Sequence, residues 1–318
     1  MTMAATPETL KEFLRRECES PPSGAALAVV EAARRRHGAT VKAVLFYGSC
    51  LRDGADEERI IDLYLLVGSC RMALINPVSA LLCRRLPPNV YYVETDFQGR
   101  TVRAKYALME LDQFIRGVSG QWLQSYLWAR FAQPTTIVMA SDETVKDRLL
   151  EALRGAILKM LEESLPLAAE EFDTRTLWSR GFQESYRAEL RAERPGRAEE
   201  IVDAFAERYR GVSALAFKEK HGATVAALGC DRYRQRQSDR DSSLCRRRWL
   251  LRRLIGKPLT VLRLCKAAFT FRGGAKYLAW KIERHSGVKV ALAPWQERHP
   301  ILASSVLFWK LYRKGAFR

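Results

Sequence analysis

The sequence lacks an apolar run long enough to cross a bilayer as a helix. No stretch of eighteen or more residues is predominantly apolar, and a membrane-spanning helix needs about twenty such residues. The first twenty residues contain four glutamates and no apolar core. We therefore expect neither a secretory signal nor a typical transit peptide there, and any membrane contact is expected to be peripheral.

Cysteine and histidine are too scattered to form a recognisable metal or hydrolase motif. The seven cysteines are odd in number and show no CxxC or cysteine–histidine metal spacing. We therefore expect a reducing compartment and no structural zinc. The four histidines are scattered and none pairs with a visible nucleophile, which gives a hydrolase triad little support.

Acidic residues are scarce towards the C-terminus. Residues 246–318 contain 18 lysines and arginines against two glutamates, a net +16 of the chain's +17, and four of the seven tryptophans. Basic residues interleaved with aromatic and aliphatic ones are typical of an interfacial membrane helix. A basic helical subdomain packed on the core and a nucleic-acid-binding segment stay open as alternatives. The residues expected to contact an anionic membrane are Trp249, Arg252, Arg253 and Trp309.

Two short apolar runs, residues 41–46 and 60–67, frame the part of the sequence that carries chemistry. Both are rich in β-branched and aromatic residues and are separated by a charged stretch with turn formers, which predicts two buried strands. The second run contains one charge, Asp62. A carboxylate inside such a strand is costly to bury unless it meets a cation, and a metal ion would supply one.

The first run ends in Tyr47-Gly48-Ser49. A glycine lets backbone N–H groups approach phosphate oxygens, and a serine hydroxyl adds a donor. A Gly-Ser turn, then about a dozen residues, then an aspartate in an apolar strand is the pattern of the polymerase-β-like nucleotidyltransferase superfamily.

The position that usually holds a second carboxylate in that superfamily is Tyr64 here. Two-metal chemistry needs several carboxylates, so another strand must supply one or the site is inactive. Glu94 and Asp96 lie on the first arm of a predicted hairpin and share a face by alternation. Either could be the missing metal ligand; the alternative is a solvent-facing pair.

The segment 43–139 resembles the mitochondrial-type phosphatidate cytidylyltransferases, which also keep a single aspartate on that strand. Residues 89–92 (NVYY), Gly99-Arg100 and Lys105-Tyr106 resemble further segments of that family. The resemblance implies that CTP and phosphatidate give CDP-diacylglycerol and pyrophosphate, with Mg²⁺, at a membrane surface. It implies catalytic roles for Asp62 and Lys105, with the metal on Asp62. The nucleotide-binding residues that it implies are Tyr47, Gly48, Ser49, Lys105 and Tyr106.

We expect an α+β fold. Residues 1–115 would form a nucleotidyltransferase domain with a mixed sheet, residues 116–245 a mostly helical domain, and residues 246–318 a basic amphipathic membrane-associating region. Periodicity and turn signals predict helices over 7–20, 25–37 and 77–86, and a hairpin over 90–109.

The function expected from these features is that of a peripheral enzyme on an anionic, phosphatidate-containing membrane, with no nucleic-acid partner. The membrane would be the cytoplasmic face in a bacterium or, alternatively, the matrix face of the mitochondrial inner membrane. Two other functions stay open. One is a nucleotide- or RNA-binding protein on a degenerate nucleotidyltransferase fold, and the other is a nucleotidyltransferase with a different acceptor.

Overall fold

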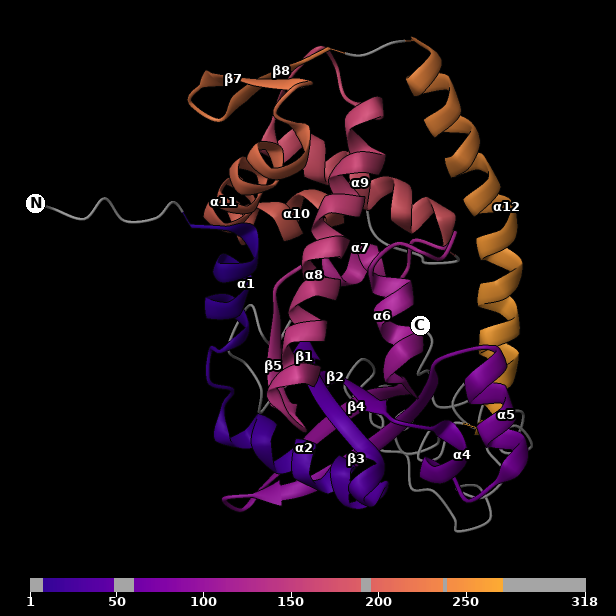
Figure 1. The fold of residues 1–318 in the computed structure, drawn as a ribbon. Helices are drawn as coiled ribbons and strands as arrows, with labels where there is room; N and C mark the ends of the chain where they lie inside the picture. Colours follow the sequence, from indigo (N-terminus) through magenta and orange to yellow (C-terminus); the bar gives the residue numbers. More distant parts are fainter. Residues whose placement is uncertain (1–7, 49–59, 190–195, 237–238, 271–318) are drawn as a thin grey trace, which may run out of the picture. The chain divides into compact units, whose positions relative to one another are not determined.

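The computed structural model describes residues 8–48, 60–189, 196–236 and 239–270 (Figure 1). They form two compact units. The helical unit takes its described residues from 1–21 and 111–261, and the sheet unit takes its own from 22–110 and 262–270. The α+β class expected from the sequence is confirmed, with the difference that the first helix, α1 (Leu10–Cys18), belongs to the helical unit.

The sheet unit is built on a mixed sheet, in which its four strands follow the order β3-β4-β2-β1. Strands β2 and β4 are parallel, whereas the β1–β2 and β3–β4 pairs are antiparallel. The β3–β4 pair is the predicted hairpin, with a tight turn at Gln98 and Gly99, both at positive φ. The four strands are β1 (Val41–Tyr47), β2 (Ile60–Val67), β3 (Asn89–Phe97) and β4 (Arg100–Glu110).

Strand β2 lies in the middle of this sheet because its residues are apolar on both faces. Ile61 and residues 63–67 are all fully buried. A strand that is covered on both faces is a continuous apolar run rather than an alternating one. Asp62 interrupts this buried run, and its side chain keeps 24% of its surface exposed.

Two helices of the sheet unit, over 24–35 and 77–85, have recognisable start signals and match predicted helices, whereas a third helix of one turn was not predicted. Helix α2 (Gly24–Arg35) begins after Ser23, whose hydroxyl accepts from the Ala26 amide. Helix α4 (Cys70–Ala73) is a single turn, and α5 (Pro77–Arg85) begins with an asparagine cap and a proline in the first turn. A Cβ on Gly24 would lie 2.7 Å from the Phe97 ring, so the glycine lets α2 approach β3 closely.

The helical unit surrounds the long helix α8, whose buried side chains run along most of its length. Its helices besides α1 are α6 (Leu111–Val118), α7 (Trp128–Phe131), α8 (Glu143–Ser164), α9 (Thr174–Ala188), α10 (Arg197–Asp203) and α11 (Ala206–Ala216). Its strands are β5 (Thr135–Ala140), β6 (Glu171–Asp173), β7 (Val225–Gly229) and β8 (Arg232–Gln235); the last three form a small sheet in the order β6-β8-β7.

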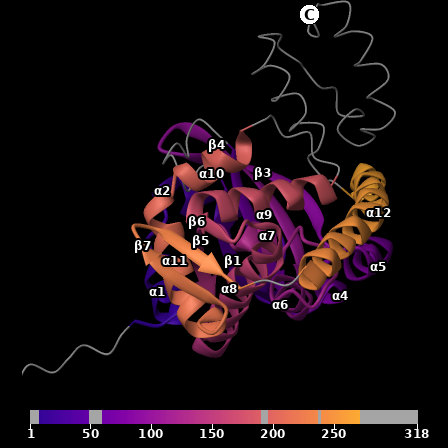
Figure 2. The same cartoon turned by 90° about the horizontal axis from the view of Figure 1, so that it is seen from above.

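The last described element is α12 (Asp239–Thr270), one continuous helix in both views despite Pro258 in its interior (Figure 2). The chain passes from the helical unit to the sheet unit within it, between Val261 and Leu262. Of the helices that the structure describes, none combines the length and the apolar character required to cross a membrane.

Candidate functional site

Four polar side chains form one row across the sheet of the sheet unit. Asp62 on β2 lies opposite Tyr47 on β1 and opposite Lys105 on β4. Lys105 in turn lies opposite Tyr92 on β3. Residues that are directly opposite each other on neighbouring strands point to the same face. The register therefore brings together the predicted residues Tyr47, Asp62 and Lys105.

Asp62 and Lys105 form an ion pair. The Lys105 ammonium lies 3.1 Å from Oδ1 of Asp62, and the two side chains are 37% and 24% exposed. Oδ1 itself is buried, and no described residue makes a well-directed hydrogen bond to it. Lys105 thus compensates the charge of the carboxylate, while Oδ1 keeps acceptor capacity that no hydrogen bond from a described residue uses.

Gly48 lies against the Asp62 carboxylate at the end of β1. Its φ is +96°, and a Cβ at this position would lie 3.1 Å from Oδ2 of Asp62. Glycine is required here both because side-chain-bearing residues disfavour this backbone conformation and because the space is taken by the carboxylate. The next residue of the predicted phosphate-binding turn, Ser49, lies outside the described residues.

Tyr64, at the position of the missing second carboxylate, is a core residue. It has no exposed surface, and its ring lies 5.4 Å from the ring of Tyr47, centroid to centroid. A carboxylate in its place would be buried among apolar side chains at a high cost. The tyrosine therefore fills the interior beside Asp62 and leaves this aspartate as the acidic residue of β2.

Glu94 and Asp96 have partners of their own. Tyr92 donates to Glu94 at 3.1 Å, and Arg103 Nε lies 3.9 Å from the same carboxylate. Burial, followed by the charge of Glu94, raises the pKa of Tyr92, so its hydroxyl stays protonated and remains a donor. Asp96 accepts from the Gly99 amide at 3.2 Å and caps the hairpin turn.

The predicted metal set of Asp62, Glu94 and Asp96 is not assembled. In the part of the chain that the structure describes, no group of three or more acidic, histidine or cysteine side chains is placed to hold a metal ion. Strand β4 lies between β2 and β3, which separates the two later carboxylates from Asp62. The same-face prediction for Glu94 and Asp96 agrees with the register, but this face does not converge on one ion.

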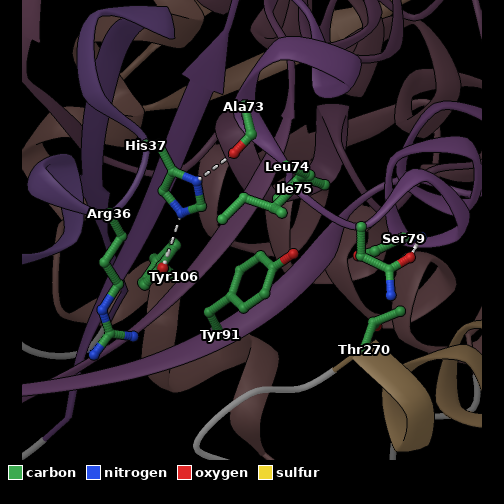
Figure 3. Close-up of a pocket in the computed structure, with 10 residues that line it drawn as sticks. Arg36, His37, Ala73, Leu74, Ile75, Ser79, Tyr91, Tyr106 and Thr270 are labelled. Carbon is green, nitrogen blue, oxygen red and sulfur yellow. Dashed lines mark hydrogen bonds between the residues drawn. The ribbon is translucent and has the colours of Figure 1, made fainter.

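Tyr106 lies on the opposite face of the sheet from Lys105, because consecutive residues of a strand alternate. Its ring stacks on Tyr91 at 5.3 Å, and its hydroxyl lies 3.0 Å from Nε2 of His37 (Figure 3). The predicted nucleotide contacts Lys105 and Tyr106 are therefore separated by the sheet. The sequence offered no signal for the His37 contact, since 69 residues separate the two partners.

The face that carries Tyr106 contains a cavity of about 390 Å³ (Figure 3). His37 Nδ1 lies 3.0 Å from the Ala73 carbonyl; since a carbonyl only accepts, Nδ1 carries the proton and Nε2 accepts from Tyr106. Burial lowers the pKa of His37, so the ring is neutral at pH 7. The cavity lining is Arg36, His37, Ala73, Leu74, Ile75, Asn76, Ser79, Tyr91, Tyr106 and Thr270.

Two of the residues expected to contact a membrane are instead interior residues of the helical unit. Trp249 is 1% exposed and Arg252 is 4% exposed. Arg252 forms a two-pronged ion pair with Glu163 at 2.7 and 2.8 Å, and Trp249 Nε1 donates to the Glu163 carbonyl at 3.1 Å. The membrane prediction is wrong for these two residues. Both side chains are used to contact Glu163, a buried acidic residue of α8.

The other two residues predicted to contact a membrane are Arg253 and Trp309. Arg253 forms an ion pair with the buried carboxylate of Glu184 and is partly exposed. Trp309 lies outside the described residues. The exposed side chains of this part of α12 include the aliphatic Leu250, Leu251 and Leu254 and the basic residues Arg246, Arg247, Arg248 and Lys257.

Comparison with known proteins finds similarity among solved structures. Among solved structures, the chain is similar to a nucleotidyltransferase-like protein from Exiguobacterium sibiricum, with 14% identity over 92% of each chain and a TM-score of 0.25. No family model matches the sequence, and no curated protein is similar to it.

Proposed function

We propose that the sheet unit binds a nucleoside triphosphate beside Gly48 and that the chain transfers its nucleotidyl group. The observation that carries the proposal is the contact of Gly48 with the Asp62 carboxylate, with Lys105 paired to the same carboxylate. A bare backbone next to a carboxylate and an ammonium brings together an anion-binding turn, a cation ligand and a charge partner for phosphate.

Asp62 suits a single Mg²⁺ that is shared with the substrate. Magnesium is often held by one or two carboxylates together with substrate phosphates, rather than by an all-protein set of ligands. The buried Oδ1, which lacks a hydrogen bond from a described residue, fits this role. When bound, the ion would neutralise charge on the triphosphate and polarise the phosphorus that is attacked.

The finer proposal is a phosphatidate cytidylyltransferase. The resemblance of residues 43–139 to that family supports CTP as the nucleotide and phosphatidate as the acceptor. One oxygen of the phosphatidate phosphate attacks the α-phosphorus of CTP in line, a new P–O bond forms, the bond to the β-phosphate breaks, and pyrophosphate leaves. A phosphate monoester is already anionic near neutral pH, so positioning suffices and no strong base is needed.

The residues of this chain have separate roles in that reaction. The Gly48 turn and Ser49 would bind the triphosphate through N–H and hydroxyl donors. Lys105 would exchange part of its pairing with Asp62 for the charge that builds up on the phosphates. The reaction would take place at the surface of an anionic membrane, on the cytoplasmic face of a bacterium or on the matrix face of the mitochondrial inner membrane.

The decisive experiment incubates the purified full chain with CTP, Mg²⁺ and phosphatidate vesicles and measures CDP-diacylglycerol and pyrophosphate in equal amounts. Parallel reactions replace CTP with ATP, GTP or UTP, and phosphatidate with phosphatidylcholine. Release of pyrophosphate with another acceptor would keep the nucleotidyltransferase and reject the lipid substrate. Nucleotide binding without any transfer would favour the alternative of a binding protein on a degenerate fold.

A further inference from the structure

An apolar, basic surface on the sheet unit is left uncovered by the fold. It consists of the exposed side chains of residues 71–85, and we refer to it as the α4–α5 surface. Its large apolar members are Met72, Ile75, Val78 and Leu81, with exposed fractions of 77%, 97%, 62% and 55%. Exposed apolar side chains grouped in this way mark an interaction surface in soluble proteins.

The outward direction of these side chains is fixed by contacts on the other side of the two helices. Ala80 and Cys83 are buried. The Asn89 amide of β3 donates to the carbonyl and to the hydroxyl of Ser79 at 3.1 and 3.0 Å. The Cys70 amide of α4 donates to Glu110 at 3.0 Å. Rotating α4 or α5 to hide the apolar side chains would break these contacts.

The charge of the α4–α5 surface is of one sign. Arg71, Arg84 and Arg85 are exposed, and the sequence contains no acidic residue from 63 to 93. Aliphatic side chains flanked by arginines match a bilayer with anionic headgroups, which offers hydrocarbon below and negative charge above. RNA is a poorer match, because single-stranded RNA is bound largely by aromatic stacking and residues 65–90 contain no aromatic side chain.

We propose that the α4–α5 surface is a membrane-docking surface for anionic lipid, separate from the basic C-terminal segment. Its aliphatic side chains enter the interface while its arginines pair with lipid phosphates. Ile75 also lines the His37 cavity (Figure 3), so the docked bilayer lies at the mouth of that cavity. The inference needs no catalytic activity and goes beyond the transfer reaction proposed above.

The test measures binding of the full chain to vesicles of phosphatidylcholine with and without phosphatidylglycerol, an anionic lipid that is not the proposed substrate. Exchange of Ile75 and Val78 for serine (I75S/V78S) should weaken binding about tenfold. The matched control is Leu27→Ser, which alters another exposed leucine of the sheet unit, on α2 and should leave binding unchanged. Arg71→Gln combined with Arg85→Gln should weaken binding about fivefold for each arginine and reduce its salt dependence.

A second variant, expected to bind vesicles more tightly, distinguishes loss of the surface from loss of the fold. Ile75→Trp should strengthen binding to the anionic vesicles at an unchanged melting temperature, since tryptophan favours the membrane interface. The proposal is overturned if I75S/V78S binds vesicles as tightly as L27S does. It is also overturned if these substitutions abolish RNA binding or self-association while vesicle binding persists.

Discussion

Lys105 Nζ lies 3.1 Å from Oδ1 of Asp62 across the parallel pair of β2 and β4. The two residues are 43 positions apart, and the strand register makes them direct neighbours. The pair explains how an acidic residue is tolerated in the most apolar strand of the sheet. It also places a cation and a carboxylate next to the Gly48 turn, on which the proposed nucleotide site depends.

Asp62→Asn should reduce CTP-dependent transfer at least about a hundredfold, because it removes the metal-binding charge and little volume. Product formation and the melting temperature are the measurements. Asp112→Asn is the control, since Asp112 is an exposed aspartate paired with Arg148 and far from the row in sequence. Near-normal turnover of the Asp62 variant would rule out the metal assignment.

Gly48→Ala and Gly99→Ala separate backbone strain from the effect on the site. Both glycines have positive φ, and each alanine should cost about 1–2 kcal/mol of stability. At Gly99 a Cβ meets no described atom within 4 Å, whereas at Gly48 it meets the Asp62 carboxylate. Only Gly48→Ala should therefore lose CTP binding, measured by calorimetry. Equal binding by the two variants would show that Gly48 is only a turn residue.

Glu163→Gln should destabilise the helical unit by about 3–5 kcal/mol, because it leaves the buried Arg252 without its counter-charge. Glu162→Gln is the matched control: this neighbour is partly exposed and pairs with Lys159 and Lys220, so its loss should cost about 0–1 kcal/mol. Urea denaturation of the two variants measures the difference. Similar losses would mean that the buried pair adds no more than a surface pair.

The Glu163 carboxylate should also make the free energy of unfolding depend on pH. Burial opposes ionisation of Glu163, but hydrogen bonds and charge from Arg252 and then Lys159 lower its pKa from 4.5 to about 2. The depressed pKa contributes stability that is complete above about 4.5 and is lost as the pH falls towards about 2. Denaturation of wild type and Glu163→Gln across this range should show a steeper fall for the wild type.

His37 should add a pH dependence at milder acidity. Burial lowers the pKa of His37 below 6.5, so the unfolded chain binds this proton more readily than the folded one. Its contribution to stability is complete above pH 6.5 and falls as the pH drops through the lowered pKa. His37→Gln should remove this part of the pH profile, measured by denaturation at pH 7 and below. An unchanged profile would show that the ring titrates equally in both states.

The sequence by itself determined the strands, the hairpin and the aspartate on an apolar strand, because local period and turn chemistry set these features. The sequence also indicated a turn at Gly48, whereas its positive φ and its contact with the Asp62 carboxylate come from the structure. Alternation also placed Glu94 and Asp96 on one face. Local pattern could not give their distance from Asp62, because that depends on β4 lying between β2 and β3.

Only the tertiary structure decided what the basic and aromatic helix α12 contacts. An interfacial membrane helix and a helix packed on a buried acid share the same composition, and the choice depends on Glu163, which lies 89 residues before Arg252. The contact of His37 with Tyr106 was beyond local pattern for the same reason. Local sequence fixes the direction in which a side chain points, whereas its partner is decided by packing between segments that are distant in the chain.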